Sequence, residues 1–129
     1  MSKKRDHGKH NKDLCDIIPN SHNDWIITTA FYACIHYIDH ALFPVLHNGI
    51  TYNSIEEWHT SLKPRSRSPH ESRKILVNYY LNTQYPNFKH LFSSCMNARY
   101  VDYVVGNNQA NLAKKKAEDI IHECLSIKP

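Results

Sequence analysis

The segment that constrains this chain most runs from Trp25 to Phe43, WIITTAFYACIHYIDHALF, and is apolar on nearly every side of a helix. Ser21 and Asp24 precede it in a capping arrangement, and Pro44 ends it. A helix that is apolar all round is stable only when it is buried on all sides. We therefore predict that this segment is the central helix of the fold.

The rest of the chain also shows helical rather than strand periodicity. Only three glycines are present, and no strictly alternating pattern of apolar and polar residues persists. Short turns join the last three predicted helices, which should pack as antiparallel neighbours. The sequence therefore predicts an all-α fold, an antiparallel four- or five-helix bundle, with helices over residues 12–18, 25–43, 55–62, 69–82, 88–105 and 109–127.

The length of 129 residues fits one domain. Residues 1–12 are rich in lysine and arginine, and we expect them to form a flexible basic segment ahead of a single helical domain over residues 13–129. The four cysteines, Cys15, Cys34, Cys95 and Cys124, show no C-x-x-C spacing. They are predicted to be buried thiols in a reducing compartment.

The sequence also lacks two features that bear on where the protein is located in the cell. No apolar run approaches the roughly 20 residues of a membrane span, and the first residues lack the apolar region of a secretory signal. We expect a soluble cytoplasmic protein that has no membrane partner.

Basic residues are concentrated in the stretch KPRSRSPHESRK at residues 63–74, which contains five cationic side chains and one histidine. The formal net charge of the chain is +4, which favours an anionic partner. Ser68 can serve as the N-cap of a helix, Pro69 as its first residue and Glu71 as its third. The stretch is therefore predicted to be the entrance of a helix and an anion-binding site.

His70 lies in the first turn of this predicted helix. The helix N-terminus and Arg73, one turn further on, should both lower the pKa of its imidazole. Arg65, Arg67 and Arg73 would hold a phosphate, and His70 would act as general acid or base in a metal-free cleavage of a phosphodiester. The alternative interpretation is a solvated basic loop with a histidine at a helix cap.

Two other groups of residues are weaker candidates. Arg99, Asp102 and Tyr103 are spaced to share one face of the fourth major helix, as part of a ligand site or as a simple intrahelical ion pair beside a packed tyrosine. His36 and His40 are one turn apart, the spacing of two metal ligands on one helix. Because the chain contains ten histidines, such a pair is expected by chance. We therefore favour structural roles for both and predict no metal and no cofactor.

Three stretches, WIITTAFYACIHYIDHAL, SPHESRKILVNYYL and LFSSCMNARYVDY, resemble the successive helices of HEPN (higher eukaryotes and prokaryotes nucleotide-binding) domains. The likeness covers about residues 20–105 and is strongest in FYACIHYIDHAL and ARYVDY. The resemblance implies a four- or five-helix bundle, frequent homodimerisation, and a role in nucleotide or RNA handling, often in toxin–antitoxin or phage-defence systems.

Many catalytic HEPN domains are metal-independent ribonucleases with an arginine, a short gap and a histidine. Arg65 and His70 have that spacing here, and the polar Ser66 follows the arginine. Two hypotheses stay open. The first is a HEPN-like helical module that binds nucleotide, RNA or a protein partner such as an antitoxin through its basic face at residues 63–74. The second is a metal-independent endoribonuclease that uses His70, Arg65 and Arg73.

Overall fold

The computed structural model of the chain describes residues 2–129 and confirms the all-α prediction. Its helices are α1 (Lys3–Ile17), α2 (Asn23–Leu42), α3 (Ile55–Leu62), α4 (Pro69–Tyr80), α5 (Tyr85–Tyr100) and α6 (Asn107–Ile127). Single 3-10 turns at Asn20–His22 and Asn82–Gln84 lead into α2 and α5. A short hairpin, β1 (Val45–His47) and β2 (Ile50–Tyr52), follows α2. No helix within residues 2–129 combines the length and apolarity that a membrane crossing needs.

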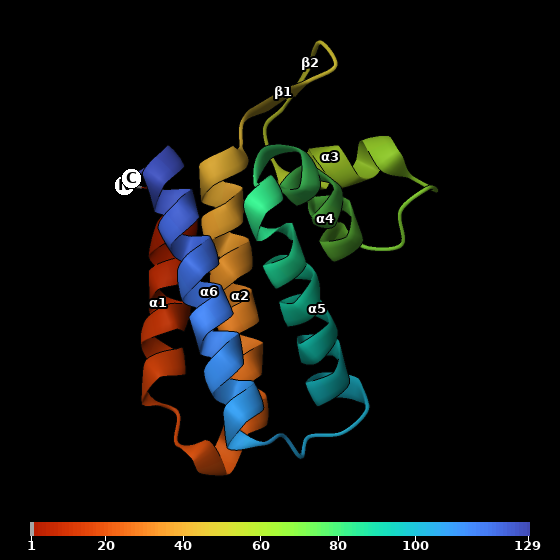
Figure 1. The fold of residues 1–129 in the computed structure, drawn as a ribbon. Coiled ribbons are helices and arrows are strands. Elements are labelled where there is room, and N and C mark those ends of the chain that lie inside the picture. Colours follow the sequence, from red (N-terminus) through yellow and green to blue (C-terminus); the bar gives the residue numbers. More distant parts are fainter. Residues whose placement is uncertain (1) are drawn as a thin grey trace.

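The centre of the bundle is α2, as the apolar segment predicts. It packs against α1, α5 and α6, and these four helices form the long body of the molecule (Figure 1). α4 packs against α5, and α3 packs against α4 at one end of that body. Fifteen of the 20 residues of α2 are buried, so this helix supplies most of the core.

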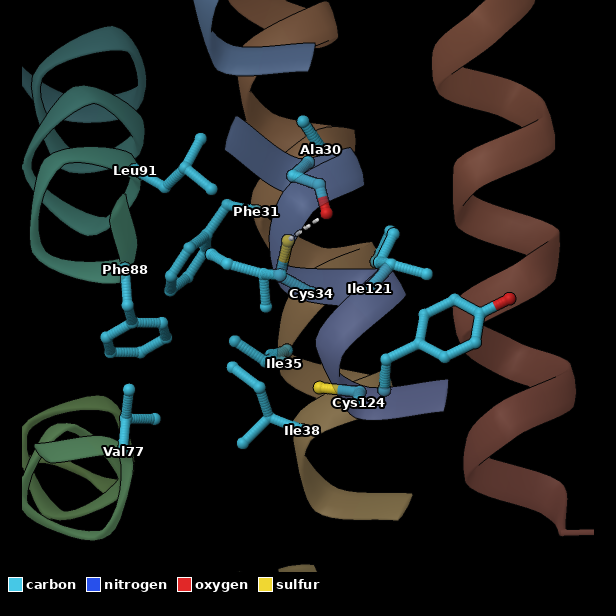
Figure 2. Close-up of a cluster of buried hydrophobic side chains, with 14 of the residues drawn as sticks. Ala30, Phe31, Cys34, Ile35, Ile38, Val77, Phe88, Leu91, Ile121 and Cys124 are labelled. Atoms are coloured by element: carbon cyan, nitrogen blue, oxygen red, sulfur yellow. Dashed lines mark hydrogen bonds between the residues drawn. The ribbon is translucent and has the colours of Figure 1, made fainter. Parts of the chain in front are cut away.

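The core is one continuous cluster of apolar side chains, most of them from α2, α4, α5 and α6, with smaller contributions from α1, α3 and β1. Figure 2 shows Phe31 of α2 facing Phe88 of α5, with Cys34 directed toward α6. The Cys34 thiol donates a hydrogen bond to the carbonyl oxygen of Ala117 at 3.7 Å. All four cysteines are free and buried, as predicted. Burial raises the pKa of Cys124 to about 12, so this thiol stays protonated at neutral pH.

The prediction of a flexible N-terminal segment is wrong, because α1 begins at Lys3 and packs along α2. The Ser2 hydroxyl caps it by accepting a hydrogen bond from the backbone N–H of Arg5. Gly8 lets α1 approach α2 closely, since a Cβ there would lie 2.7 Å from the Tyr37 ring. The sequence predicts only the end of this helix, over residues 12–18, because Gly8 and Cys15 are the only buried residues of α1 and they give no apolar periodicity.

The hairpin was not predicted either. Its turn uses Asn48 and Gly49, with φ of 51° and 80°, and an Asn-Gly pair in the left-handed region is the preferred two-residue hairpin turn. Each strand has only three residues, too few to show an alternating pattern. The hairpin rests on α3 and α4 through His47, whose ring packs edge-on against Trp58 and Tyr79.

The end of one predicted helix needs correction. The fourth major helix ends at Tyr100 rather than near residue 105, and both Tyr100 and Val104 are exposed. Asp102 accepts a hydrogen bond from the N–H of Val104 at 2.9 Å, and such a local side-chain bond competes with helix continuation. On α4, Leu76 and Val77 form the buried stripe. Ile75, Tyr79 and Tyr80 lie outside the core, as does Leu112 on α6.

Candidate functional site

The start of α4 is built as the sequence predicts. Ser68 is the N-cap, its hydroxyl accepts a hydrogen bond from the Glu71 N–H at 3.2 Å, and Pro69 opens the helix. The loop before it is tied to α4 through Ser72, whose hydroxyl donates to Ser66 at 2.6 Å and lies 2.6 Å from His59 Nδ1. The Trp58 indole N–H donates to the Ser72 carbonyl at 2.8 Å. Residues 63–68 are therefore held in place by α3 and α4.

Arg73 forms a salt bridge with Asp39 on α2. Its Nε and Nη2 donate to the two carboxylate oxygens of Asp39 at 2.7 and 2.8 Å. The two side chains are only 5% and 3% exposed. This bidentate pair fixes α4 to the central helix, and it leaves the Arg73 guanidinium inaccessible to a phosphate in solution.

His70 is oriented by the same arginine. Arg73 Nη1 lies 2.9 Å from His70 Nδ1. The half-buried ring packs edge-on against Phe31, Tyr32 and Phe92, with centroids 5.2, 6.2 and 5.7 Å away. Burial, with a further contribution from Arg73, lowers the pKa of His70, so the imidazole is neutral at pH 7, as predicted.

The hydrogen bond to Arg73 decides what this imidazole can do. A guanidinium can only donate, so His70 Nδ1 accepts and the ring proton lies on Nε2. Neither ring nitrogen then has a free lone pair. A general base needs such a lone pair within reach of the proton that it abstracts, and this arrangement does not supply one.

Two adjoining cavities lie on the surface of α4 and α5. The first, of about 300 Å³, is lined by Arg65, Ser66, Arg67, Glu71, Lys74 and Ile75. The second, of about 530 Å³, shares Glu71 and Lys74 with the first. Its walls also include Lys89, Phe92, Asn97, Tyr100 and Val101. We call the two cavities together the α4–α5 face.

The α4–α5 face combines positive charge with exposed aromatic surface. Its lining contains four cationic side chains, those of Arg65, Arg67, Lys74 and Lys89, and one carboxylate, that of Glu71. Lys74 pairs with Glu71 at 2.9 Å and also lies over the Phe92 ring at 5.9 Å. Tyr100 is 75% exposed at the end of α5. His70 and Arg99 line neither cavity.

Arg99, Asp102 and Tyr103 do not share a helix face, because α5 ends before Asp102. The Arg99 guanidinium instead stacks over the Trp25 ring of α2 at 4.6 Å. Tyr103 is 73% exposed in the connection to α6. The predicted grouping of these three residues is therefore wrong.

His36 and His40 have separate environments. The His36 ring stacks on His7 of α1 with centroids 3.7 Å apart, and burial, followed by the charge of His7, lowers its pKa to about 4. His40 Nε2 lies 3.0 Å from the Lys128 carbonyl oxygen. Within residues 2–129, no group of three or more His, Cys, Asp or Glu side chains is arranged to hold a metal ion.

Sequence reasoning missed the larger cavity, although a signal for it was present. Lys89, Phe92, Met96 and Tyr100 follow one another at intervals of three or four residues, so they lie on one face of α5. An apolar row at helical spacing usually faces inward, so this row alone does not indicate an exposed cavity.

A comparison with protein-family models, with curated proteins and with solved structures found no match to this chain. The resemblance to HEPN domains therefore stays a prediction that rests on the sequence patterns alone.

Proposed function

We propose that this chain is a binding module for single-stranded RNA and that the α4–α5 face is its RNA-binding surface. The observation that carries the proposal is the position of Lys74, which lies between a hollow rimmed by Arg65 and Arg67 and a cavity walled by Phe92 and Tyr100.

The positive charge of the α4–α5 face supports the binding of a polyanionic ligand. Lysine and arginine side chains bind the phosphate backbone of nucleic acids and displace its counterions. The four cations of the α4–α5 face line two adjoining cavities that share Lys74, so together they can contact more than one phosphate of a backbone. The single carboxylate, on Glu71, is paired with Lys74 and leaves a positive excess.

The exposed aromatic surface of the α4–α5 face supports the binding of unpaired bases. The larger cavity, at about 530 Å³, falls within the range of roughly 300 to 1,000 Å³ for small-molecule sites. Tyr100 offers an exposed ring on which a base can stack, and Asn97 offers an amide for a base edge. Only a base that is free of its complementary strand can enter such a cavity, so single-stranded RNA fits better than a duplex.

The geometry of His70 supports binding without cleavage. Its Nδ1 is occupied by Arg73, and Arg73 itself is buried against Asp39. A ribonuclease built on Arg65 and His70 is the alternative function, and one experiment separates the two.

The test uses the purified chain with a labelled single-stranded RNA of mixed sequence in EDTA, with fluorescence anisotropy to measure binding and a denaturing gel to measure cleavage. We expect binding and intact RNA. Lys74→Gln and Lys89→Gln should each weaken binding and lower the slope of log affinity against log salt concentration by about 0.7, the contribution of one contact to single-stranded nucleic acid.

Lys9→Gln is the matched control, because Lys9 is an exposed lysine of α1, on the other side of α2 from α5 (Figure 1). Its affinity for RNA should equal that of the parent. Equal losses in all three variants would overturn the assignment of the α4–α5 face. RNA cleavage that His70→Ala and Arg65→Ala both abolish would establish the ribonuclease instead.

A further inference from the structure

A carboxylate forms part of the wall of the larger cavity on the α4–α5 face. Glu71, in the first turn of α4, lines this cavity together with Phe92, Asn97 and Tyr100 of α5. Its side chain is 38% exposed, so a ligand in the cavity can reach it. A carboxylate repels phosphate, so this residue suits contact with a base rather than with the RNA backbone.

The Glu71 carboxylate lies close to the aromatic wall of the cavity. Its Oε2 is 2.9 Å from Lys74 Nζ, and this Nζ is 5.9 Å from the centroid of the Phe92 ring. The ion pair restrains the glutamate side chain at the junction of the two cavities, which both residues line. Each carboxylate oxygen can still accept a further hydrogen bond, because it has two lone pairs.

An acceptor pair of this kind distinguishes the four RNA bases. An ionised carboxylate only accepts hydrogen bonds, through two neighbouring oxygens. Guanine is the one RNA base whose Watson–Crick edge carries two adjacent donors, N1–H and the N2 amine. Adenine and cytosine place a ring-nitrogen lone pair beside their amine, and uracil has a carbonyl oxygen on either side of its N3–H. Each of these three bases therefore brings a lone pair against a carboxylate oxygen, which costs affinity.

We infer that the larger cavity of the α4–α5 face prefers guanine and that Glu71 is the residue that selects it. This inference rests on the proposed RNA-binding function and names the base that the cavity accepts. The two Glu71 oxygens accept from N1–H and from the N2 amine, and the Asn97 amide donates to O6. The base stacks on Tyr100, and Lys74 and Lys89 contact phosphates.

Short oligouridine strands that differ at a single central base test the inference, with fluorescence anisotropy of the full chain as the measurement of affinity. The strand with guanine should bind about tenfold more tightly than the strand with adenine, because a matched bidentate contact discriminates against the wrong base. Inosine keeps N1–H and lacks the N2 amine, so the strand with inosine should bind with an affinity between the other two.

Two glutamates provide matched variants, because each lies in the first turn of its helix. Glu71→Gln replaces one acceptor with a donor, and a glutamine amide matches the adenine edge. This variant should bind the adenine strand at least as tightly as the guanine strand, and its binding of adenine shows that the fold is intact. Glu56→Gln, on α3 and outside the α4–α5 face, should keep the preference of the parent for guanine.

The outcomes separate the guanine preference from RNA binding itself. Equal affinities of the parent for the guanine and adenine strands would overturn the guanine preference and leave RNA binding in place. A guanine preference that survives in Glu71→Gln would overturn the role of Glu71. Failure of every strand to bind would overturn the proposed function, and the guanine preference with it.

Discussion

At the scale of single residues, the pair formed by Arg73 and Asp39 does most to define both the core and the candidate site. It joins α4 to α2 and fixes the proton of His70 on Nε2. From the sequence, Arg73 was predicted to face solvent and phosphate. Nothing in the local pattern could reveal its true partner, because Asp39 lies 34 residues earlier in the chain.

This pair gives a prediction for stability. Asp39→Asn or Arg73→Met should lower the free energy of unfolding by about 3 to 5 kcal/mol, because each leaves one buried charge without its partner. The double variant Asp39→Leu/Arg73→Met should be closer to the parent than either single variant. Urea denaturation measures all four proteins, and a loss under about 1 kcal/mol in both single variants would contradict the buried pair.

The stacked rings of His7 and His36 predict a dependence of stability on pH. The pKa of His36 is lowered to about 4 in the folded chain, below its ordinary value of about 6.5. Between these values the unfolded chain binds more protons than the folded chain, so the free energy of unfolding falls as the pH decreases from about 6.5 to 4.

His36→Gln should reduce the slope of stability against pH in that window, as measured by denaturant midpoints at several pH values. His22→Gln is the control, because His22 is exposed at the turn before α2. An unchanged slope in His36→Gln would contradict the account. The slope should not vanish, since the pKa values of His70 and His90 are also lowered.

At the scale of elements, long periodic segments and helix caps could be predicted, and packing of polar segments could not. The central helix and the Ser68 cap were found from sequence, because apolar periodicity and capping residues are local signals. Only the end of helix α1 was predicted, as a helix over residues 12–18, since Gly8 and Cys15 are the only buried residues of α1 and they give no apolar periodicity. The hairpin was missed since its strands are too short for periodicity, although Asn48 and Gly49 marked its turn.

The attachment of α1 can be tested at Gly8. Alanine usually stabilises the interior of a helix relative to glycine. Gly8→Ala should instead destabilise the chain by about 1 to 3 kcal/mol, because the new Cβ would meet the buried Tyr37 ring at 2.7 Å. The midpoint of thermal unfolding measures the effect, with Asn11→Ala on the same helix as the control. A raised midpoint in Gly8→Ala would show that α1 does not pack as described.

At the scale of the whole molecule, the α4–α5 face is an open surface that is both basic and aromatic. The sequence located the basic stretch at residues 63–74 correctly at the start of α4. It could not show that Arg73 turns inward while Lys89 and Tyr100 of α5 complete the surface, because that depends on how two helices pack.

The most direct test of the RNA-binding surface is the affinity of Tyr100→Ala for a short single-stranded RNA, with Tyr103→Ala as the matched control. Both tyrosines are about equally exposed, at 75% and 73%, but only Tyr100 lines the larger cavity. Loss of one stacked base costs about 1 to 3 kcal/mol, so Tyr100→Ala should bind roughly 5- to 150-fold more weakly, and Tyr103→Ala should bind as the parent does. Equal affinities in the two variants would contradict the assignment of RNA binding to the α4–α5 face.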